Sequence, residues 1–319
     1  MMRILKFGGK SLETLEKTQK ICKNIKKIYK NDKQLIIVVS AMGNTTNNLI
    51  EMAEHFKPEN NSKRELDALL STGETLSSSI FAMALQSVGL PAKSFSGWQI
   101  KIKTYGDHQH SLISSIDKTK LEQCLKQNVI AVVAGFQGVN CDGDITTLGR
   151  GGSDTTAAAL GAVFQTNVEI YSDFNGMFSG DPRNANFKKL NQVSLKQLSS
   201  VTKLGSKIVS NRAVNIAKNN NLSLILKSSS QPFLNGTVAS GLEKENIIFV
   251  ENDNLCEISI EIENSNKINF CAKNVFLLLK NYRLYNFSIN FNKITILVNQ
   301  SDKLEILNQL NKKLKFLKS

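Results

Sequence analysis

The chain has 319 residues, 41% hydrophobic and 21% charged, which is typical of a globular protein with two domains or one large and one small domain. No apolar run approaches the roughly 18–20 residues of a membrane-spanning helix, so we predict no membrane segment. The N-terminus is too charged for a secretion signal. The five scattered cysteines show no metal-ligand spacing, so we expect a reducing, cytoplasmic location.

The net charge of +13 raises the question of nucleic-acid binding. The lysines, however, are spread along the whole chain, and no zinc-finger or aromatic RNA-binding motif accompanies them. We therefore predict no nucleic-acid partner. A positive field also attracts anionic small molecules, including nucleotides.

Strands and helices alternate along the first three quarters of the chain. Strands are expected at residues 3–7, 35–39, 129–134, 168–171 and 222–226. Helices are expected at residues 12–30, 49–56, 64–88, 154–164 and 206–219. In the first helix, the apolar spacing predicts one buried face formed by Leu15, Ile21, Ile25 and Ile28. This order favours an α/β layered fold with a mostly parallel sheet, in which ligands bind beyond the carboxyl ends of the strands.

The composition changes near residue 240. Beyond it we expect strands at residues 258–262 and 294–298 and helices at residues 275–279 and 304–317. The sequence therefore predicts a large domain over residues 1–240 and a small α+β domain over residues 241–319.

Three segments combine glycines with charged residues. In Gly149–Ala157, three glycines and a serine surround Arg150 ahead of an expected helix, a pattern suited to binding an anion. An ordinary glycine-rich turn has the same composition. Lys6–Ser11 follows a strand but lacks P-loop spacing; Lys6 could reach a phosphate or simply be an exposed strand-end lysine. Ser172–Arg183 has two aspartates, an aromatic residue and an arginine, as a nucleotide site or a surface turn would.

Taken together, the segments resemble the aspartokinases, within the amino acid kinase family. The resemblance extends from Met2 to about Ser228 and rests on six segments in family order. These are Lys6–Gly9, Val38–Met42 with Thr46-Asn47, Ser71–Glu74, Gly149–Asp154, Tyr171–Arg183, and Gly205–Lys207 ahead of Arg212–Val214.

This resemblance implies a three-layer α/β/α catalytic domain that binds ATP, Mg²⁺ and L-aspartate at the C-terminal edge of the sheet. The implied reaction transfers the γ-phosphate of ATP to the side-chain carboxylate, giving 4-phospho-L-aspartate, the first step of lysine, threonine and methionine biosynthesis. The family commonly carries two C-terminal ACT modules, whereas this tail predicts one short, degenerate ACT-like unit for regulation or dimerisation. We therefore expect a homodimer with weak or absent feedback inhibition.

The resemblance also implies site residues. The catalytic residues would be Lys6, Asp154 and Lys207. The substrate pocket would contain Ser40, Thr46, Glu74, Arg150, Gly151, Gly152 and Ser153. The ATP site would contain Lys6, Gly8, Gly9, Ser172, Asp173, Phe178, Asp181, Arg183 and Lys207. Glu74 would hold the α-ammonium group, Arg150 the α-carboxylate, and Asp154 would orient Lys6; Mg²⁺ would be held through the ATP phosphates and not by protein ligands.

A catalytic histidine is not required, because the accepting carboxylate is already ionised near neutral pH. We therefore interpret His55, His108 and His110 as surface residues. Three positions depart from the family pattern: Lys10 replaces a usual threonine, Phe178 a common tyrosine, and Ser210-Asn211 a typical His-Pro. None removes a charged catalytic position, so we expect an active enzyme.

Two alternatives remain. The chain could be another amino acid kinase, acting on glutamate, acetylglutamate, carbamate or UMP, although Lys6–Ser11 and Gly149–Asp154 favour aspartate. It could also be a catalytically silent sensor of an amino acid or a nucleotide. The intact charged set argues against this: Lys6, Glu74, Arg150, Asp154 and Lys207.

Overall fold

The computed structural model describes residues 2–56, 62–181, 187–203, 208–242, 247–252, 257–262, 265–282, 284–299 and 301–313. It forms two compact units. Unit 1 contains Met1–Asn175 and Arg212–Gly236, and unit 2 contains Gly176–Asn211 and Thr237–Ser319. Residues 176–211 thus belong to the same compact unit as the C-terminal residues.

A parallel sheet forms the centre of unit 1. Its strands follow the order β13 (Leu224–Ser228), β9 (Val168–Ser172), β1 (Arg3–Phe7), β2 (Leu35–Val39), β6 (Ile130–Ala134) and β3 (Ala92–Phe95). Every residue of β2 and β6 is buried, as expected for strands covered on both faces. The predicted α/β fold with a mostly parallel sheet is confirmed.

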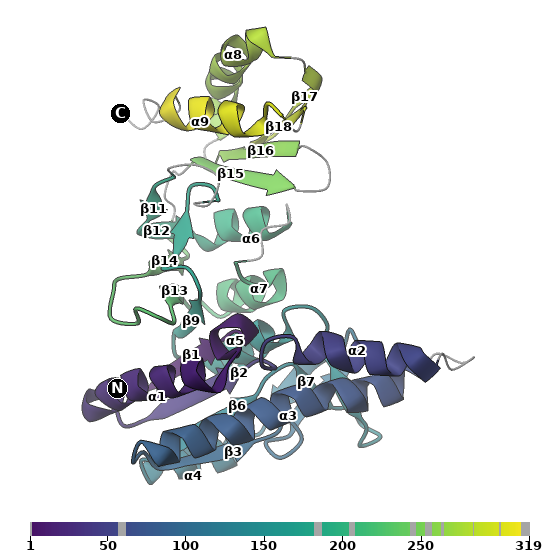
Figure 1. The fold of residues 1–319 in the computed structure, drawn as a ribbon, viewed down its shortest axis with the longest axis vertical. Coiled ribbons are helices and arrows are strands. Elements are labelled where there is room, and N and C mark those ends of the chain that lie inside the picture. Colours follow the sequence, from purple (N-terminus) through teal and green to yellow (C-terminus); the bar gives the residue numbers. More distant parts are fainter. Residues whose placement is uncertain are drawn as a thin grey trace. The chain divides into compact units, whose positions relative to one another are not determined.

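Helices cover both faces of this sheet (Figure 1). On one face, α1 (Leu15–Asn31) and α3 (Lys63–Ser87) pack with the side chains of Leu5, Phe7 and Ile37. The neighbouring residue Lys6 points to the opposite face, where it meets α5 (Gly152–Phe164), since successive side chains of a strand alternate. The helices α2 (Thr45–Phe56), α4 (Thr119–Lys126) and α7 (Asn211–Asn219) complete the helical set around the sheet.

One detail of the first helix differs from the prediction. Ile21, Ile25 and Ile28 are buried as expected, whereas Leu15 is 61% exposed. Leu15 is the first residue of α1, which begins after the capping residue Thr14. The apolar spacing correctly identified the buried face, but it does not show how far along the helix that face is covered.

A second, small sheet in unit 1 was not predicted from the sequence. Its strands follow the order β5 (Leu112–Ile116), β4 (Ile102–Tyr105), β7 (Gln137–Val139) and β8 (Ile145–Thr147). These strands are short and rich in Thr, Ser and Gln, so they lack the apolar run by which the central strands were recognised. The loops that leave this sheet contribute to the candidate site.

Unit 2 combines short strands with an α+β module. Strand β10 (Met177–Phe178) pairs with β11 (Lys189–Leu190), and β12 (Gln192–Ser194) pairs with β14 (Thr237–Ser240) ahead of α6 (Leu195–Lys203). The module has an antiparallel sheet in the order β15 (Ile247–Asn252), β16 (Glu257–Ile262), β18 (Lys293–Val298) and β17 (Leu284–Asn290), with helices α8 (Ile268–Leu278) and α9 (Lys303–Lys313). The predicted small α+β unit is confirmed.

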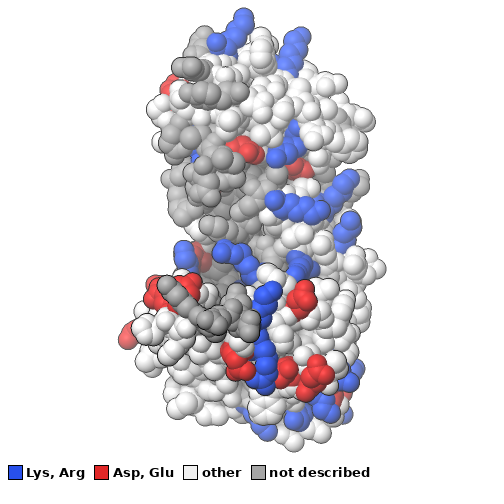
Figure 2. Space-filling view, turned by 90° about the vertical axis from the view of Figure 1, so that its right-hand side faces the viewer, with Lys and Arg blue, Asp and Glu red and all other residues white. Residues whose placement is uncertain are grey.

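The surface carries basic and acidic side chains together. On the face drawn in Figure 2, lysine and arginine are distributed over the whole face, and several lie beside acidic residues.

Among the residues that the structure describes, no helix has both the length and the apolarity needed to cross a bilayer. The described cysteines are free thiols, with Cys22, Cys124 and Cys271 buried and Cys141 exposed.

Candidate functional site

The loops after β1 and β2 are fastened to each other at the C-terminal edge of the sheet. The amide of Gly43 donates to the Gly9 carbonyl over 3.0 Å, and the amide of Ser40 donates to the Phe7 carbonyl over 3.1 Å. A Cβ atom at Gly9 would lie 2.6 Å from the carbonyl oxygen of Ala41. Only glycine fits there without displacing backbone, and the two loops therefore form one continuous wall.

Lys6 and Asp154 form an ion pair near these two loops. Lys6 lies near the end of β1 and is 8% exposed, and Asp154 lies in the first turn of α5 and is 7% exposed. The Lys6 Nζ atom is 2.6 Å from the Asp154 Oδ1 atom. The structure thus brings together the two residues that the resemblance paired. Their contact fixes the ammonium group of a long, flexible side chain at the strand end.

Glu74 is a buried carboxyl group beside the same loops. It is 4% exposed, and its Oε1 atom accepts a hydrogen bond of 3.0 Å from the amide of Ala41. Its Oε2 atom is buried and has no hydrogen-bond partner among the described residues. Burial raises the pKa of Glu74 from 4.5 to about 7, against the opposing effects of the Ala41 amide and the positive charge of Lys6. A buried acceptor with one free oxygen is suited to a cationic ligand group.

Ser40 and Thr46 were predicted to line the substrate pocket together with Glu74, and both are half-buried. Ser40 is the first residue after β2, and Thr46 lies in the first turn of α2. The start of α2 packs closely on α3, because a Cβ atom at Gly73 would lie 3.6 Å from the Thr45 Cγ2 atom. Gly73 immediately precedes Glu74, and Thr45 immediately precedes Thr46, whereas Ser40 is adjacent to Ala41, whose amide donates to Glu74.

The segment from Thr147 to Gly152, here called the Arg150 loop, connects β8 to α5. Arg150 is exposed, and it lies between two glycines with positive φ, Gly149 and Gly151, both at 73°. Gly152 and Ser153 are buried at the start of α5, where a Cβ atom at Gly135 would lie 2.7 Å from the Ser153 Cβ atom. The loop brings the N-terminal end of α5 and a guanidinium group to the same region, a combination suited to an anion.

Arg212 supports this loop, and sequence reasoning gave it no role. Its guanidinium group donates to the carbonyl of Leu148 over 2.6 Å and to the carbonyls of Ser111 and His110 over 3.4 Å. Phe136 was also missed: it is half-buried with φ at 70°, a backbone region that costs a non-glycine residue about 1–2 kcal/mol. Its amide donates to the Thr156 hydroxyl over 3.1 Å, which fastens it to α5. A positive φ cannot be recognised from an aromatic residue in a sequence.

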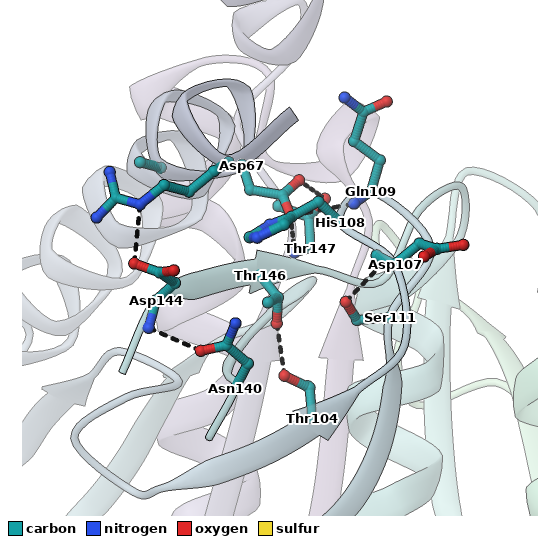
Figure 3. A network of polar contacts seen from close by, with 12 residues as sticks. Asp67, Thr104, Asp107, His108, Gln109, Ser111, Asn140, Asp144, Thr146 and Thr147 are labelled. Atoms are coloured by element: carbon teal, nitrogen blue, oxygen red, sulfur yellow. Dashed lines mark hydrogen bonds and ion pairs between the residues drawn. The ribbon is translucent and has the colours of Figure 1, made fainter. Parts of the chain in front are cut away.

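The interpretation of the three histidines as surface residues was wrong for one of them. His55 and His110 are exposed. The His108 side chain is 23% exposed, and its Nδ1 atom lies 2.7 Å from the Oδ2 atom of Asp67, which is fully buried (Figure 3). A buried carboxylate on another element was not visible from the spacing of either residue.

The residues expected to bind the nucleotide are divided between the two units. Ser172 is the last residue of β9 and Asp173 follows it, both in unit 1, and the Ser172 hydroxyl accepts a hydrogen bond of 3.3 Å from the Phe174 amide. Phe178 and Asp181 belong to unit 2, and Phe178 packs against the apolar core of that unit. Arg183 and Lys207 lie outside the described residues. The predicted nucleotide site therefore stays a prediction.

Mg²⁺ was predicted to bind through nucleotide phosphates. Within the described ranges, no group of three or more His, Cys, Asp and Glu side chains is arranged to hold a metal ion. The residues present offer basic groups and amides, which suit phosphate oxygens, and the protein has no described carboxylate cage of the kind that holds a cation by itself.

The sequence comparisons cover most of unit 1. Residues 1–228 match the model of the amino acid kinase family. The chain is 40% identical over 230 residues to an aspartokinase of Geobacillus stearothermophilus, covering 72% of this chain and 56% of that protein. It is 37% identical over 276 residues to an aspartokinase of Rickettsia bellii, covering 84% of this chain and 67% of that protein. The chain thus spans little more than half the length of the first relative.

The structural comparison concerns the fold. Aspartokinase III of Escherichia coli, crystallised with aspartate and ADP, matches with a TM-score of 0.82 at 16% identity, over 99% of this chain and 100% of that chain. At this level of identity the likeness extends to the arrangement of strands and helices and not to individual side chains.

Proposed function

The chain belongs to the amino acid kinase family, and from this premise we propose that it is an ATP-dependent aspartate kinase. The proposed reaction transfers the γ-phosphoryl group of ATP to the side-chain carboxylate of L-aspartate, giving ADP and 4-phospho-L-aspartate. The names of the relatives support aspartate as the substrate, and the name of the E. coli complex supports an adenine nucleotide.

The observation that carries the proposal is the environment of Glu74. Its Oε2 atom is buried and unpaired among the described residues, and its other oxygen is bonded to the Ala41 amide in the loop after β2. The positive charge of Lys6 also acts on this carboxyl group. Leaving a buried acceptor without a partner costs about 1–3 kcal/mol, which an ammonium group would recover. We assign this oxygen to the α-ammonium group of the amino acid, and the exposed guanidinium of Arg150 to its α-carboxylate.

The remaining groups handle charge. Two anions must approach each other, so the reaction depends mainly on positioning and on stabilising the charge of the transferred group. We propose that Lys6, held by Asp154, neutralises the phosphoryl oxygens, while Gly8 and Gly9 let the backbone of their loop approach the same group. The nucleotide contacts that the resemblance implies for Lys207 and Arg183 stay predictions, because both residues lie outside the described ranges. Mg²⁺, when bound with ATP, would supply additional charge neutralisation at the phosphates.

No general base is assigned. The side-chain carboxylate of aspartate has a pKa of about 4 and is already a nucleophile at neutral pH. Clamping the amino acid at its ammonium and α-carboxylate groups therefore provides orientation, which contributes several kcal/mol in well-aligned reactions. Because the reaction needs charge stabilisation and orientation and no general base, the proposed site contains cations and amides and needs no histidine.

The test measures ADP formation from MgATP with L-aspartate and traps the acyl phosphate with hydroxylamine. Lys6→Ala should lower kcat by at least about 100-fold, because the charge facing the phosphoryl group is lost. Lys20→Ala removes an exposed lysine from α1 and serves as the matched control with wild-type kcat.

A substrate panel with glutamate, acetylglutamate, carbamate and UMP separates aspartate kinase from the other kinases of the family. Turnover of one of these and not of aspartate would replace the proposed substrate. Binding of ATP and aspartate with no turnover would indicate a silent sensor.

A further inference from the structure

One acidic residue of unit 1 is completely buried and is not part of the proposed catalytic set. Asp67 lies in α3 and is 0% exposed. Its Oδ1 atom accepts from the Thr147 hydroxyl over 2.5 Å, and its Oδ2 atom accepts from the amides of Thr147 and Gln109, each over 3.0 Å (Figure 3). The Nδ1 atom of His108 lies 2.7 Å from the same Oδ2 atom. A carboxylate accepts about four hydrogen bonds at most, so Asp67 is saturated by this one set of contacts.

All of these contacts lead to the Arg150 loop. Thr147 begins the loop, three residues before Arg150. His108 and Gln109 belong to the turn of residues 107–111, which buttresses the loop: a Cβ atom at Gly149 would lie 2.6 Å from the Gln109 carbonyl oxygen. The amide of Ser111 also donates to the Thr147 carbonyl over 3.1 Å. Asp67 therefore fixes both the beginning of the loop and the turn against which the loop rests.

The orientation of the Arg150 side chain depends on the conformation of the loop backbone. Its side chain is exposed, and within the described part of the chain no hydrogen bond or ion pair holds it. The flanking glycines, Gly149 and Gly151, have positive φ and add freedom to the backbone. Without an external anchor, a loop of this composition would sample many orientations of the guanidinium group.

The same helix also carries Glu74. Asp67 and Glu74 are seven residues apart in α3, which places them on one face of the helix, about 10 Å apart along its axis. We propose that Asp67 is a positioning residue that sets the Arg150 loop against α3, so that one helix determines where both ends of the amino acid are held. Glu74 acts directly on the ammonium group, and Asp67 acts on the carboxylate end through Thr147 and the loop. This inference rests on the proposed function.

Asp67→Asn tests the proposal because it keeps the side-chain shape and removes acceptor capacity. The KM for aspartate should rise about 10- to 100-fold, since a displacement of about 1 Å has effects of this size. The kcat at saturating aspartate and the KM for ATP should stay within about threefold of wild type. A general loss of structure would instead lower kcat and raise both KM values together.

A second pair of variants covers the case in which Asp67→Asn does not fold. Thr147→Val removes the hydroxyl donor with little change of shape and should raise the KM for aspartate in the same direction, whereas Thr147→Ser keeps the donor and should restore it. Asp144→Asn is the matched control, because Asp144 also joins this region to α3, through an ion pair of 2.8 Å with Arg64, but does not contact the Arg150 loop. It should leave the KM for aspartate unchanged.

Amide hydrogen exchange of the ligand-free protein gives a readout that is independent of turnover. Asp67→Asn should accelerate exchange in residues 147–152 at least about tenfold, with α1 unchanged. Wild-type turnover with an unaltered aspartate KM in Asp67→Asn and Thr147→Val, or unaltered exchange in the loop, would overturn the positioning role while leaving the proposed function intact. Failure of the wild type to use aspartate would overturn the proposed function, and the substrate role of the loop with it.

Discussion

Replacing Glu74 with glutamine should stabilise the protein and at the same time abolish its affinity for aspartate. Burial raises the pKa of Glu74 from 4.5 to about 7. Each pKa unit corresponds to about 1.4 kcal/mol, so at pH 8 the buried carboxylate destabilises the folded chain by about 3 kcal/mol. Glutamine is neutral, has the same shape and still offers an oxygen to the Ala41 amide.

The sign of the effect follows from the direction of the pKa shift. Below about pH 4.5 the carboxyl group is protonated in both the folded and unfolded chains, and its favourable contribution is fully present. As the pH rises to about 7, the unfolded chain releases the proton first, so stability is lost across this window. The advantage of Glu74→Gln should therefore be under about 1 kcal/mol at pH 5 and about 3 kcal/mol at pH 8.

Urea unfolding followed by tryptophan fluorescence provides the assay. Trp98 is the single tryptophan of the chain and lies in unit 1, as does Glu74, so its emission reports the relevant unit. Glu54→Gln, at an exposed position of α2, is the control and should change the free energy of unfolding by less than about 0.5 kcal/mol at either pH. A Glu74→Gln protein that is no more stable than wild type at pH 8, or whose advantage is equal at both pH values, would refute the reasoning.

Binding should change in the opposite direction. The glutamine lacks the charge that faces the α-ammonium group, so the Kd for aspartate should rise at least about 100-fold. In the wild type, aspartate affinity should improve as the pH rises through about 7, because the carboxylate must be ionised to hold the ammonium group. Calorimetric titration between pH 6 and pH 8.5 measures both effects, and a pH-independent Kd would contradict this role.

Three further outcomes are expected. Gly9→Ala should lower kcat at least about tenfold and destabilise unit 1 by about 1–3 kcal/mol, because its Cβ atom would lie 2.6 Å from the Ala41 carbonyl oxygen. Steady-state kinetics and urea unfolding measure the two effects, and wild-type values would show that the loop moves to accommodate the methyl group. Lys10→Thr should raise the KM for ATP a few-fold by removing a charge beside the glycine loop, with an unchanged KM indicating that Lys10 does not face the nucleotide. Lysine and threonine should not inhibit the enzyme appreciably; half-maximal inhibition below about 1 mM by either would reject the prediction of a degenerate regulatory module.

The sequence alone determined the layered α/β fold, and it indicated charged residues for a candidate site. Continuous apolar runs such as Leu35–Val39 identified parallel strands, since only strands covered on both faces are apolar throughout. Glycines beside charges near expected strand ends drew attention to Lys6 and Arg150, because loops after parallel strands gather at one edge of a sheet. Glu74, which lies inside α3, was indicated only by the resemblance to the aspartokinases. These signals are local, and each depends on residue type and spacing within a short stretch.

The tertiary structure decided what these residues contact. Three contacts join elements far apart in the chain: the bond of Glu74 to the Ala41 amide, the ion pair of Lys6 with Asp154, and the bond of Asp67 to Thr147 in the Arg150 loop. The same packing leaves the Oε2 atom of Glu74 buried without a partner among the described residues. The small sheet that includes β8 was not predicted because its strands lack an apolar run. The partial burial of His108 against Asp67 was missed because a polar residue in a sequence carries no sign of being buried. Its burial becomes evident only when the partner that satisfies its hydrogen bonds is in place.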